Sequence, residues 1–409
     1  MELYDYSGRS IFSSDFDALP VVRIAGTIPT RKDVVENIEI SFVSPDVSFN
    51  CYGTIKVQGH TTVNFPKQNY NVKLYEDAEM TTKKKVKFKN WKKGNKFTIK
   101  ANYTDFSQSR NIVCSQLFCD MYKARPDFAS LPDRVKNSPV GIDGFPVQVY
   151  LNDVYYGIYT WNQPKDALFD IDDDIETECL MMGNSNENNI NTAMSVWTDE
   201  THDTMPEVIA TAWADMLSFI STSSDSAFTS GIGDKMDLTS IIDQFIMFVI
   251  AYAYDDTGNN VMFATYDTAF WYGGIYDYDK SCGNSGSINA AFLDIRSPLV
   301  AWPMGNNIAF KLYNRVFANF YSEVKSRYLA LRQTALADEA VANKFYNFSK
   351  QIPDGLLELN FAPTTGGGAF VDNANRNDVA QAIGFMIIRL GLVDAWFKTD
   401  YFSRILLTS

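Results

Sequence analysis

The feature that most constrains the fold is a change of periodicity near residue 165. Before it, short segments rich in β-branched and aromatic residues are separated by Pro, Gly, Asn or Asp, which is typical of strands joined by turns. Beyond about Asp166, apolar residues recur with the helical period instead. The sequence therefore predicts an α+β protein with a β-rich N-terminal lobe, residues 1–165, and a helical C-terminal lobe, residues 166–409. Strands are predicted at residues 19–26, 37–44, 52–59, 70–75 and 96–103, and a hairpin with the turn Asn152-Asp153 is predicted at the edge of their sheet.

The helical part contains one exception, a predicted β-hairpin between two of its helices. Its segment, residues 261–279, has two aromatic-rich runs, VMFATYD and FWYGGIYDYD, whose ends carry polar residues. We expect chemistry there, because a hairpin brings the polar residues at its two ends together. Helices are predicted at residues 109–122, 206–221, 238–253, 309–336, 338–349 and 377–398.

Composition argues against nucleic acid and membranes as partners. The formal net charge is -13 and the pI is near 4.7, whereas polyanion binding depends on lysine and arginine neutralising phosphates. The local exception is Lys83 to Lys100, where Phe88 and Trp91 interrupt a lysine run. This run fits either an anionic-ligand site or a solvated loop beside a strand, and we favour the loop. The longest apolar candidate for a membrane span, residues 241–252, contains Asp243 and Gln244, and the N-terminus has no signal-peptide pattern.

Cysteine and histidine usage leaves carboxylates and a metal as the expected catalytic groups. The five cysteines show no CxxC or Cys/His ligand spacing, so neither structural zinc nor a disulfide framework is predicted. The two histidines, His60 and His202, do not lie in nucleophile motifs. The acidic cluster Asp170 to Glu178 lacks the glycine and the spacing of a calcium loop, and we interpret it as a solvated loop.

Three polar residues around the predicted hairpin have the spacing of a phosphoryl-transfer site. Asp255 follows an apolar helix, Asn260 stands five positions later, and Asp277 stands twenty-two positions after Asp255 at the end of the hairpin. In protein kinases, an Asp and an Asn with the first spacing accept the substrate proton and hold magnesium, and a later Asp binds magnesium. Spacing alone also fits ordinary Asn-Asp turns, and the HRD and DFG motifs are absent.

Five ordered blocks raise the specificity of this pattern. They are VQGHTTVNFPKQNYNVKLY, FTIKANYTDFSQSRN, VQVYLNDVYYGIY, IIDQFIMFVIAYAYDDTGNNVMF and GGIYDYDKSCG, followed by the C-terminal segments YSEVKSRYLALR and RLGLVDAWF. Together they resemble the CotH kinase family over essentially the whole chain. The resemblance implies an atypical protein-kinase-like bilobal fold that binds ATP and Mg²⁺ (or Mn²⁺) between a sheet-rich lobe and a helical lobe.

The resemblance also implies roles for acidic residues at the hairpin. Asp255 corresponds to the catalytic Asp, and Asn260 and Asp277 correspond to the metal ligands. Asp279 corresponds either to a further ligand or to a residue that supports one. The expected partners are a nucleotide and either a protein substrate or neighbouring virion or coat proteins.

Three basic residues are candidates to bind the nucleotide phosphates. Lys67 and Lys73 match the family's Pro-Lys-x-x-Tyr-x-x-Lys pattern, and Lys73 is expected to be buried in mid-strand with an anionic partner. Alternatively, Lys73 extends from an edge strand into solvent. Arg110 opens a predicted helix, where it either reaches the phosphates or caps the helix.

Departures from the family pattern leave two functions open. Gln58 stands where the family usually has arginine, Asp153 replaces a hairpin glycine, Gln163 and Pro164 lie near a common glutamate, and Tyr276 replaces the tryptophan of W-D-x-D. One function is an ATP- and magnesium-dependent Ser/Thr kinase acting on a coat, tail or surface protein. The alternative is a weakly active or inactive structural protein of a bacteriophage tail or baseplate. The corresponding locations are a virion, the bacterial cytoplasm or the spore coat.

Overall fold

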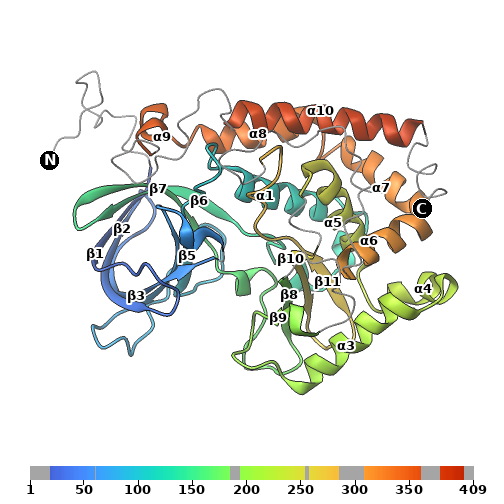
Figure 1. Cartoon of the computed structure of the whole chain (residues 1–409), viewed down its shortest axis with the longest axis horizontal. Coiled ribbons are helices and arrows are strands. Elements are labelled where there is room, and N and C mark those ends of the chain that lie inside the picture. The colour runs from blue at the N-terminus through green and yellow to red at the C-terminus, as the bar shows by residue number, and fades with distance from the viewer. Residues whose placement is uncertain are drawn as a thin grey trace.

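The first sheet of this computed structural model is a closed β-barrel (Figure 1). The structure describes residues 19–59, 61–184, 194–253, 258–284, 308–360 and 378–399. The barrel's strand order is β1-β2-β3-β4-β5-β7-β6, in which β1 and β6 are parallel and the other neighbours are antiparallel. Its strands are β1 Val21–Gly26, β2 Val35–Val43, β3 Ser48–Gln58, β4 Asn69–Tyr75, β5 Lys96–Lys100, β6 Gly144–Leu151 and β7 Val154–Asn162.

The predicted strands and hairpin are confirmed, but the hairpin does not form an edge. Asn152 and Asp153 have φ of 48° and 64°, the left-handed values that a two-residue hairpin turn requires, and Leu151 pairs with Val154. On its outer sides, β6 pairs with β1 and β7 pairs with β5. The hairpin therefore closes the sheet into a barrel, which removes the edges that an open sheet would expose.

Alternating side chains fill the barrel. In β4, Tyr70, Val72 and Leu74 point inward and are buried, whereas Asn71 and Lys73 are exposed on the outer face. In β5, Phe97 and Ile99 point inward, so Lys96, Thr98 and Lys100 share the outer face. The outer face of β5 is directed towards the part of the protein after the barrel, because Lys96 contacts Asp166 and Lys100 contacts Asp277.

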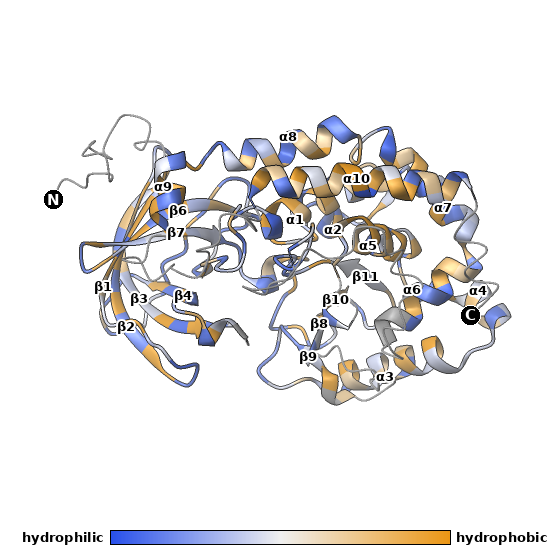
Figure 2. Ribbon diagram, turned by 45° about the horizontal axis from the view of Figure 1, so that its top comes forward, coloured by the Kyte–Doolittle hydropathy of each residue, from blue (hydrophilic) through white to orange (hydrophobic). Residues whose placement is uncertain are grey.

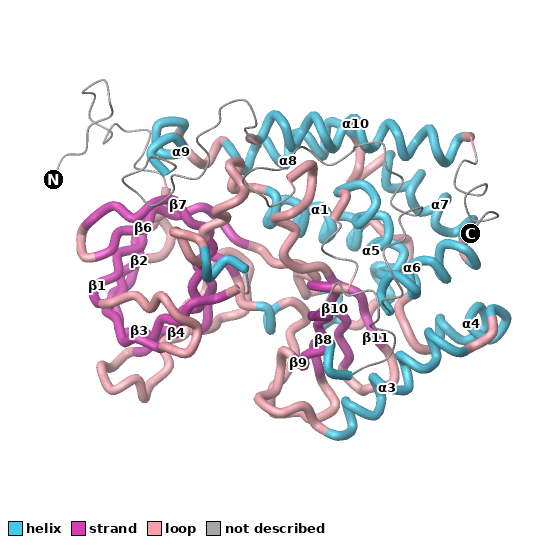
Figure 3. The backbone as a smooth tube through the Cα atoms, viewed as in Figure 1, coloured by secondary structure: helices cyan, strands magenta, loops and turns pink. Residues whose placement is uncertain are grey.

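A second, four-stranded sheet has the order β11-β10-β8-β9 and contains the predicted hairpin as β10 and β11. Figure 3 shows these strands apart from the barrel strands. We did not predict β8 and β9, which pair with one another, while β8 also pairs with β10. Their bounds are β8 Cys179–Asn184, β9 Trp197–Asp199, β10 Asn259–Thr265 and β11 Trp271–Gly274.

Helices surround the second sheet, with α5 at their centre. Figure 2 colours α5 as hydrophobic over most of its length, and its residues from Ser240 onward are buried. The helix predicted at residues 309–336 is two helices, α6 and α7, separated at Phe320. The helices are α1 Arg110–Lys123, α2 Asp133–Lys136, α3 Glu207–Thr222, α4 Asp225–Gly231, α5 Leu238–Ala251, α6 Ile308–Asn319, α7 Tyr321–Arg332, α8 Asp338–Ser349, α9 Asp354–Asn360 and α10 Val379–Lys398, with 3₁₀ turns η1 Thr61–Asn64, η2 Phe128–Ser130, η3 Lys165–Ala167, η4 Met194–Val196 and η5 Ile232–Asp234.

Helix α1 follows the barrel strand β5 in sequence but packs with the helices. It contacts α5 and α8, and its apolar residues belong to the same buried cluster as α5. The mixed α and β composition is thus confirmed, with a barrel in the N-terminal part. The division at residue 165 stays a prediction.

Helix α10 is long and apolar enough to cross a membrane by length and composition, which is weak evidence for a span. Arg389 in its middle is fully buried and its Nε donates to the backbone oxygen of Val249, 2.9 Å away. Leu390 and Met386 are also buried against the protein. These contacts are those of a helix packed into a protein core.

Candidate functional site

The polar ends of the β10–β11 hairpin lie at one end of the second sheet. Met262 pairs with Gly274, so Asn260 and Asp277, which lie just beyond this pair, are at the same end of the hairpin. The pairing of β10 with β8 shifts between Asn259 and Met262, so Asn260 lies in a bulge. Asn260 and Asp277 both have left-handed backbone, with φ of 62° and 61°. Bulges and strained backbone concentrate at functional sites, which makes this end of the sheet a candidate.

A lysine from the barrel reaches this end of the sheet. The ammonium of Lys100 in β5 donates to Oδ1 of Asp277, and the two form an ion pair. The Lys100 side chain is 4% exposed and that of Asp277 is 24% exposed, so the pair is partly shielded from water but remains open on the Asp277 side. This contact joins the barrel to the second sheet at its polar end.

Lys100 is held in its charged form. Burial works to lower the pKa of Lys100, but the charges of Asp277 and Asp279 outweigh burial, and the net pKa is above its ordinary value. The ring of Tyr276 also lies 5.5 Å from the Lys100 ammonium. Because burial raises the pKa of Tyr276, its hydroxyl stays protonated and neutral beside this pair. The site therefore presents a fixed positive charge and a fixed carboxylate.

Tyr276 has a second lysine and a glutamine around it. The ammonium of Lys165 is 5.5 Å from the Tyr276 ring and pairs with Glu200 at 2.6 Å. Gln58, the last residue of β3, donates from Nε2 to the Tyr276 hydroxyl at 3.3 Å. Gln58 and Tyr276 are two of the positions at which the chain departs from the family pattern. They are in direct contact with each other.

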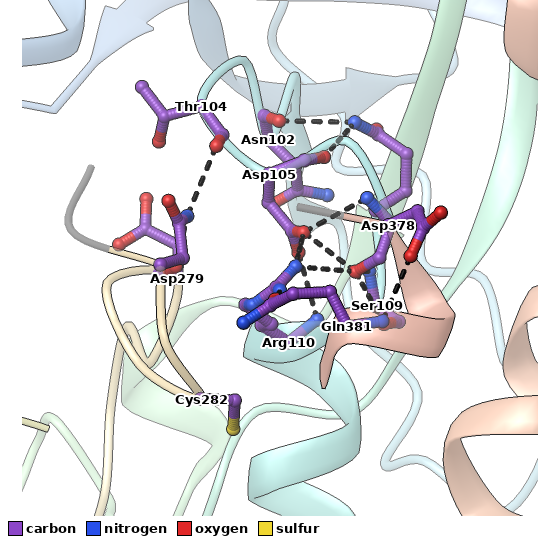
Figure 4. A network of polar contacts seen from close by, with 12 residues as sticks. Asn102, Thr104, Asp105, Ser109, Arg110, Asp279, Cys282, Asp378 and Gln381 are labelled. Carbon is purple, nitrogen blue, oxygen red and sulfur yellow. Dashed lines mark hydrogen bonds and ion pairs between the residues drawn. The ribbon is translucent and has the colours of Figure 1, made fainter. Parts of the chain in front are cut away.

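The segment after Asp277 is held against the loop that follows β5. The amide of Asn284 donates to the backbone oxygens of Thr104, at 3.1 Å, and Asp279, at 2.8 Å. Figure 4 shows Asp279 beside Thr104 in this arrangement. The backbone N–H of Cys282 donates to Ala251, at the end of α5, at 2.7 Å. Asp255, the expected catalytic residue, lies outside the described residues.

The three predicted phosphate-binding residues have surroundings other than those expected. Lys67 is 2% exposed; its ammonium donates to the backbone oxygen of Ile158 and to Oδ1 of Asn360, and lies 4.3 Å from the Tyr159 ring. These contacts join β7 to α9. Lys73 is exposed, so its expected burial is wrong, and it stands directly across from Lys96 on the outer barrel face that also carries Lys100. Arg110 is fully buried, with its contacts inside the protein (Figure 4).

Most lysines at the start of the basic run and the aspartates 172–174 of the acidic cluster are exposed to solvent, as expected for solvated loops. Phe88 and Trp91 are buried in the barrel core, and Trp91 Nε1 donates to Asp143 at 2.7 Å, so neither ring faces a ligand. Asp172, Asp173 and Asp174 are exposed, with carboxylate oxygens within 4.8 Å of one another. Glu178 instead is buried and pairs with Arg134.

The principal residue of this candidate site that we did not predict is Lys100. We grouped it with the exposed lysines of the run from Lys83, although it ends a strand whose Phe97 and Ile99 face the core. The available signal was its place directly before the Ala-Asn-Tyr motif, at the point where a strand leaves the barrel. The pairing with Asp277, 177 positions away, is tertiary and has no local signature.

Buried Lys100 pairs with the carboxylate of Asp277, at the end of the hairpin that also carries Asn260. The model of the CotH kinase protein family matches residues 55–383, and the chain therefore belongs to this family. The matched range contains Lys100, Asn260, Asp277 and Asp279. No curated protein matches the chain. Membership of the family supports a kinase-like function.

Proposed function

We propose that this chain is an ATP- and Mg²⁺-dependent protein kinase of atypical, bilobal kinase-like fold, which transfers phosphate to Ser or Thr of a coat, tail or surface protein. The observation that carries the proposal is the ion pair of the buried Lys100 with Asp277. The pair brings a cation from the barrel next to a carboxylate from the helical part. Phosphoryl transfer requires a cation that binds the phosphates and a carboxylate that binds the metal.

The residues present fit a metal–nucleotide ligand. Asp277 and Asp279 supply carboxylate oxygens and Asn260 supplies an amide oxygen, which are the hard ligands that Mg²⁺ prefers. Lys100 supplies a compact positive charge suited to phosphate oxygens. When bound, Mg-ATP supplies the phosphoryl group and a metal that neutralises its charge.

The chain's own residues divide the remaining work. Asp277 and Asn260 orient the metal, and Lys100, released in part from Asp277, binds phosphate oxygens. Asp255 orients the acceptor hydroxyl and takes its proton as the hydroxyl oxygen bonds to phosphorus and the bond to ADP breaks. Every acidic residue predicted from the sequence thus has a role in this mechanism. Lys67 and Arg110 have structural roles instead.

Two variants separate binding from transfer. Asp277→Ala is expected to abolish metal-dependent nucleotide binding, because the triphosphate charge is then uncompensated. Asp255→Ala is expected to bind nucleotide like the wild type but to transfer phosphate about 10²–10⁴-fold more slowly, as for a missing general base. Asp215→Ala, at an exposed position of α3, is the control and should change neither.

The measurements are titration calorimetry with Mg-ATP and radiolabel transfer to a Ser/Thr peptide mixture and to the protein itself. Equal transfer by the wild type and Asp255→Ala would remove the kinase mechanism.

The alternative, a structural protein of a bacteriophage tail or baseplate, is favoured by one observation. Gln58 carries no charge where the family usually has arginine, and its amide is engaged by Tyr276. A thermal-shift measurement decides between the two functions. Nucleotide at 100 times its dissociation constant stabilises the native state by about 2.7 kcal/mol, so no shift at millimolar Mg-ATP would support the structural role.

A further inference from the structure

The guanidinium of Arg110 is fully buried and contacts three separate segments of the chain (Figure 4). One Nη atom pairs with Asp105 and also donates to the Ser107 hydroxyl at 3.0 Å. Nε donates to the backbone oxygen of Ser281 at 3.2 Å. The other Nη atom donates to Oε1 of Gln381 in α10. Arg110 therefore connects the loop after β5, the segment after Asp277 and the C-terminal helix.

Asp105 fixes one side of this network. Its carboxylate accepts from the backbone N–H of Arg110 at 2.9 Å, and from the backbone N–H and hydroxyl of Ser107 at 3.1 and 2.6 Å. Asp105 is 1% exposed. Because a buried carboxylate with these donors has little freedom, it holds the Arg110 side chain in one orientation.

The residues of this network lie close in sequence to both members of the Lys100–Asp277 ion pair. The loop that contains Asp105 begins directly after Lys100, and Ser281 stands four residues after Asp277. Asn284 adds a second link, since its amide bridges the backbone oxygens of Thr104 and Asp279. Residues 104–110 thus contact the segment 277–284 at two points, Ser281 and Asn284, both on the C-terminal side of Asp279.

The first turns of helix α10 also pack against this segment. Its N-cap, Asp378, accepts from the backbone N–H of Gln381 at 2.9 Å, which fixes the first turn of the helix. At Gly283, where φ is 83°, an added Cβ would lie 2.3 Å from Nε2 of Gln381. The backbone conformation at Gly283 favours glycine, and the close approach shows that the start of α10 packs against this residue. Gln381 therefore lies directly against the segment that carries Asp277 and Asp279.

We propose that Arg110, Asp105 and Gln381 are positioning residues, which hold the segment 277–284 so that Asp277 and Asp279 face Lys100 and the metal. This inference rests on the proposed function for the identity of the ligand. It assigns Arg110 to the support of the acidic segment, in place of phosphate binding. Residues that orient metal ligands typically change metal affinity by about 10–100-fold when they are lost.

The test compares four variants in the full chain. Arg110→Gln removes the positive charge and the guanidinium donors, whereas Arg110→Lys keeps the charge but loses the planar guanidinium. Gln381→Met removes the side-chain amide on α10 that accepts from Arg110. Arg327→Gln is the matched control, because Arg327 is also a buried arginine paired with a buried carboxylate, Asp243, in contacts that do not include residues 277–284.

Two readouts are measured, hydrogen exchange of the backbone amides 277–284 without ligand, and Mn²⁺-nucleotide affinity by calorimetry. Arg110→Gln is expected to speed exchange in this segment at least about 10-fold and to weaken Mn²⁺-nucleotide affinity about 10–100-fold, with smaller effects for Arg110→Lys and Gln381→Met. Arg327→Gln is expected to lower the melting temperature and to leave both readouts at the wild-type value.

The outcomes separate this inference from the proposed function. A wild type that binds no metal–nucleotide contradicts the proposed function, and the exchange readout then decides the positioning role alone. If the wild type binds and Arg110→Gln matches it in exchange and affinity, the positioning role is wrong. Equal losses in Arg110→Gln and Arg327→Gln would also overturn it, because general destabilisation then explains both. Should Arg110→Gln fail to fold, Arg110→Lys and Gln381→Met carry the same comparison.

Discussion

Gln58 and Tyr276 contact each other across the boundary between the barrel and the second sheet. Gln58 Nε2 donates to the Tyr276 hydroxyl at 3.3 Å, and Tyr276 immediately precedes Asp277. The family pattern has arginine and tryptophan at these positions, which can also contact each other through a cation–π interaction. In this chain a neutral hydrogen bond therefore links the end of β3 to the acidic segment.

The link between Gln58 and Tyr276 can be measured by a double-mutant cycle. We expect Gln58→Ala and Tyr276→Phe to be coupled by about 0.5–1.5 kcal/mol in the free energy of unfolding, which is the usual net worth of one hydrogen bond. Urea denaturation of the single and double variants gives this term. Gln58→Ala combined with Tyr156→Phe, whose hydroxyl contacts Tyr70, serves as the non-contacting control and should be additive. Additivity in the first cycle would contradict the bond.

Lys100 and Lys73 should differ strongly in nucleotide binding, although they share the outer face of the barrel. Lys100→Met is expected to weaken Mg-ATP binding about 10- to 100-fold, because a hydrogen bond from a charged donor contributes about 1.5–3 kcal/mol. Lys73→Met should bind within about 2-fold of the wild type, since the side chain is solvated. Calorimetry on both variants checks this difference. Weaker binding by Lys73→Met alone would restore the assignment made from the sequence.

The sequence was sufficient for elements whose pattern is local. The strands of the barrel, the Asn152-Asp153 turn and the helix over residues 338–349 all follow from periodicity and turn chemistry. The short strands β8 and β9 were missed, because the apolar run of β8 does not alternate and β9 has only three residues. Closure of the barrel depends on the parallel pairing of β1 with β6, between residues more than 100 positions apart.

The candidate site was predictable on its acidic side only. Asn260 and Asp277 belong to one hairpin, so their proximity follows from local pairing. Lys100 comes from another part of the chain, and its partner could not be inferred before the barrel was placed against the second sheet. Lys67 and Arg110 stand in family motifs, but their contacts with Asn360 and Gln381 come from helices far along the chain, which a motif does not reveal.

Trp91 should be far more important for stability than the lysines around it. Trp91→Ala is expected to cost about 3–5 kcal/mol of unfolding free energy, because the ring is buried against Phe88 and Phe145 and its N–H bonds Asp143. Lys93→Ala, on the exposed part of the same loop, should stay within about 0.5 kcal/mol. Denaturant unfolding measures both variants. Salt-dependent binding of an oligonucleotide that is lost in Lys93→Ala would contradict the interpretation as a solvated loop.

Lys67 gives the protein a pH dependence that one substitution should remove. Burial lowers the pKa of Lys67 well below its ordinary value of 10.5, which the unfolded chain keeps. Between the folded pKa and 10.5 the unfolded state binds more protons, so this group makes stability rise as pH rises through that window. Below the folded pKa both states are charged and its contribution is constant.

The stability of the wild type relative to Lys67→Met should therefore increase from pH 7 to pH 10, by at most about 1.4 kcal/mol for each pH unit inside the window. Methionine keeps the apolar stem, and using the difference cancels the titration of other lysines and tyrosines. Lys73→Met, which removes an exposed lysine from the same barrel, is the matched control for the loss of one lysine. Urea unfolding at several pH values supplies both differences. Parallel curves for the wild type and Lys67→Met would show that Lys67 stays charged in the fold, held by Ile158, Asn360 and the Tyr159 ring despite its burial.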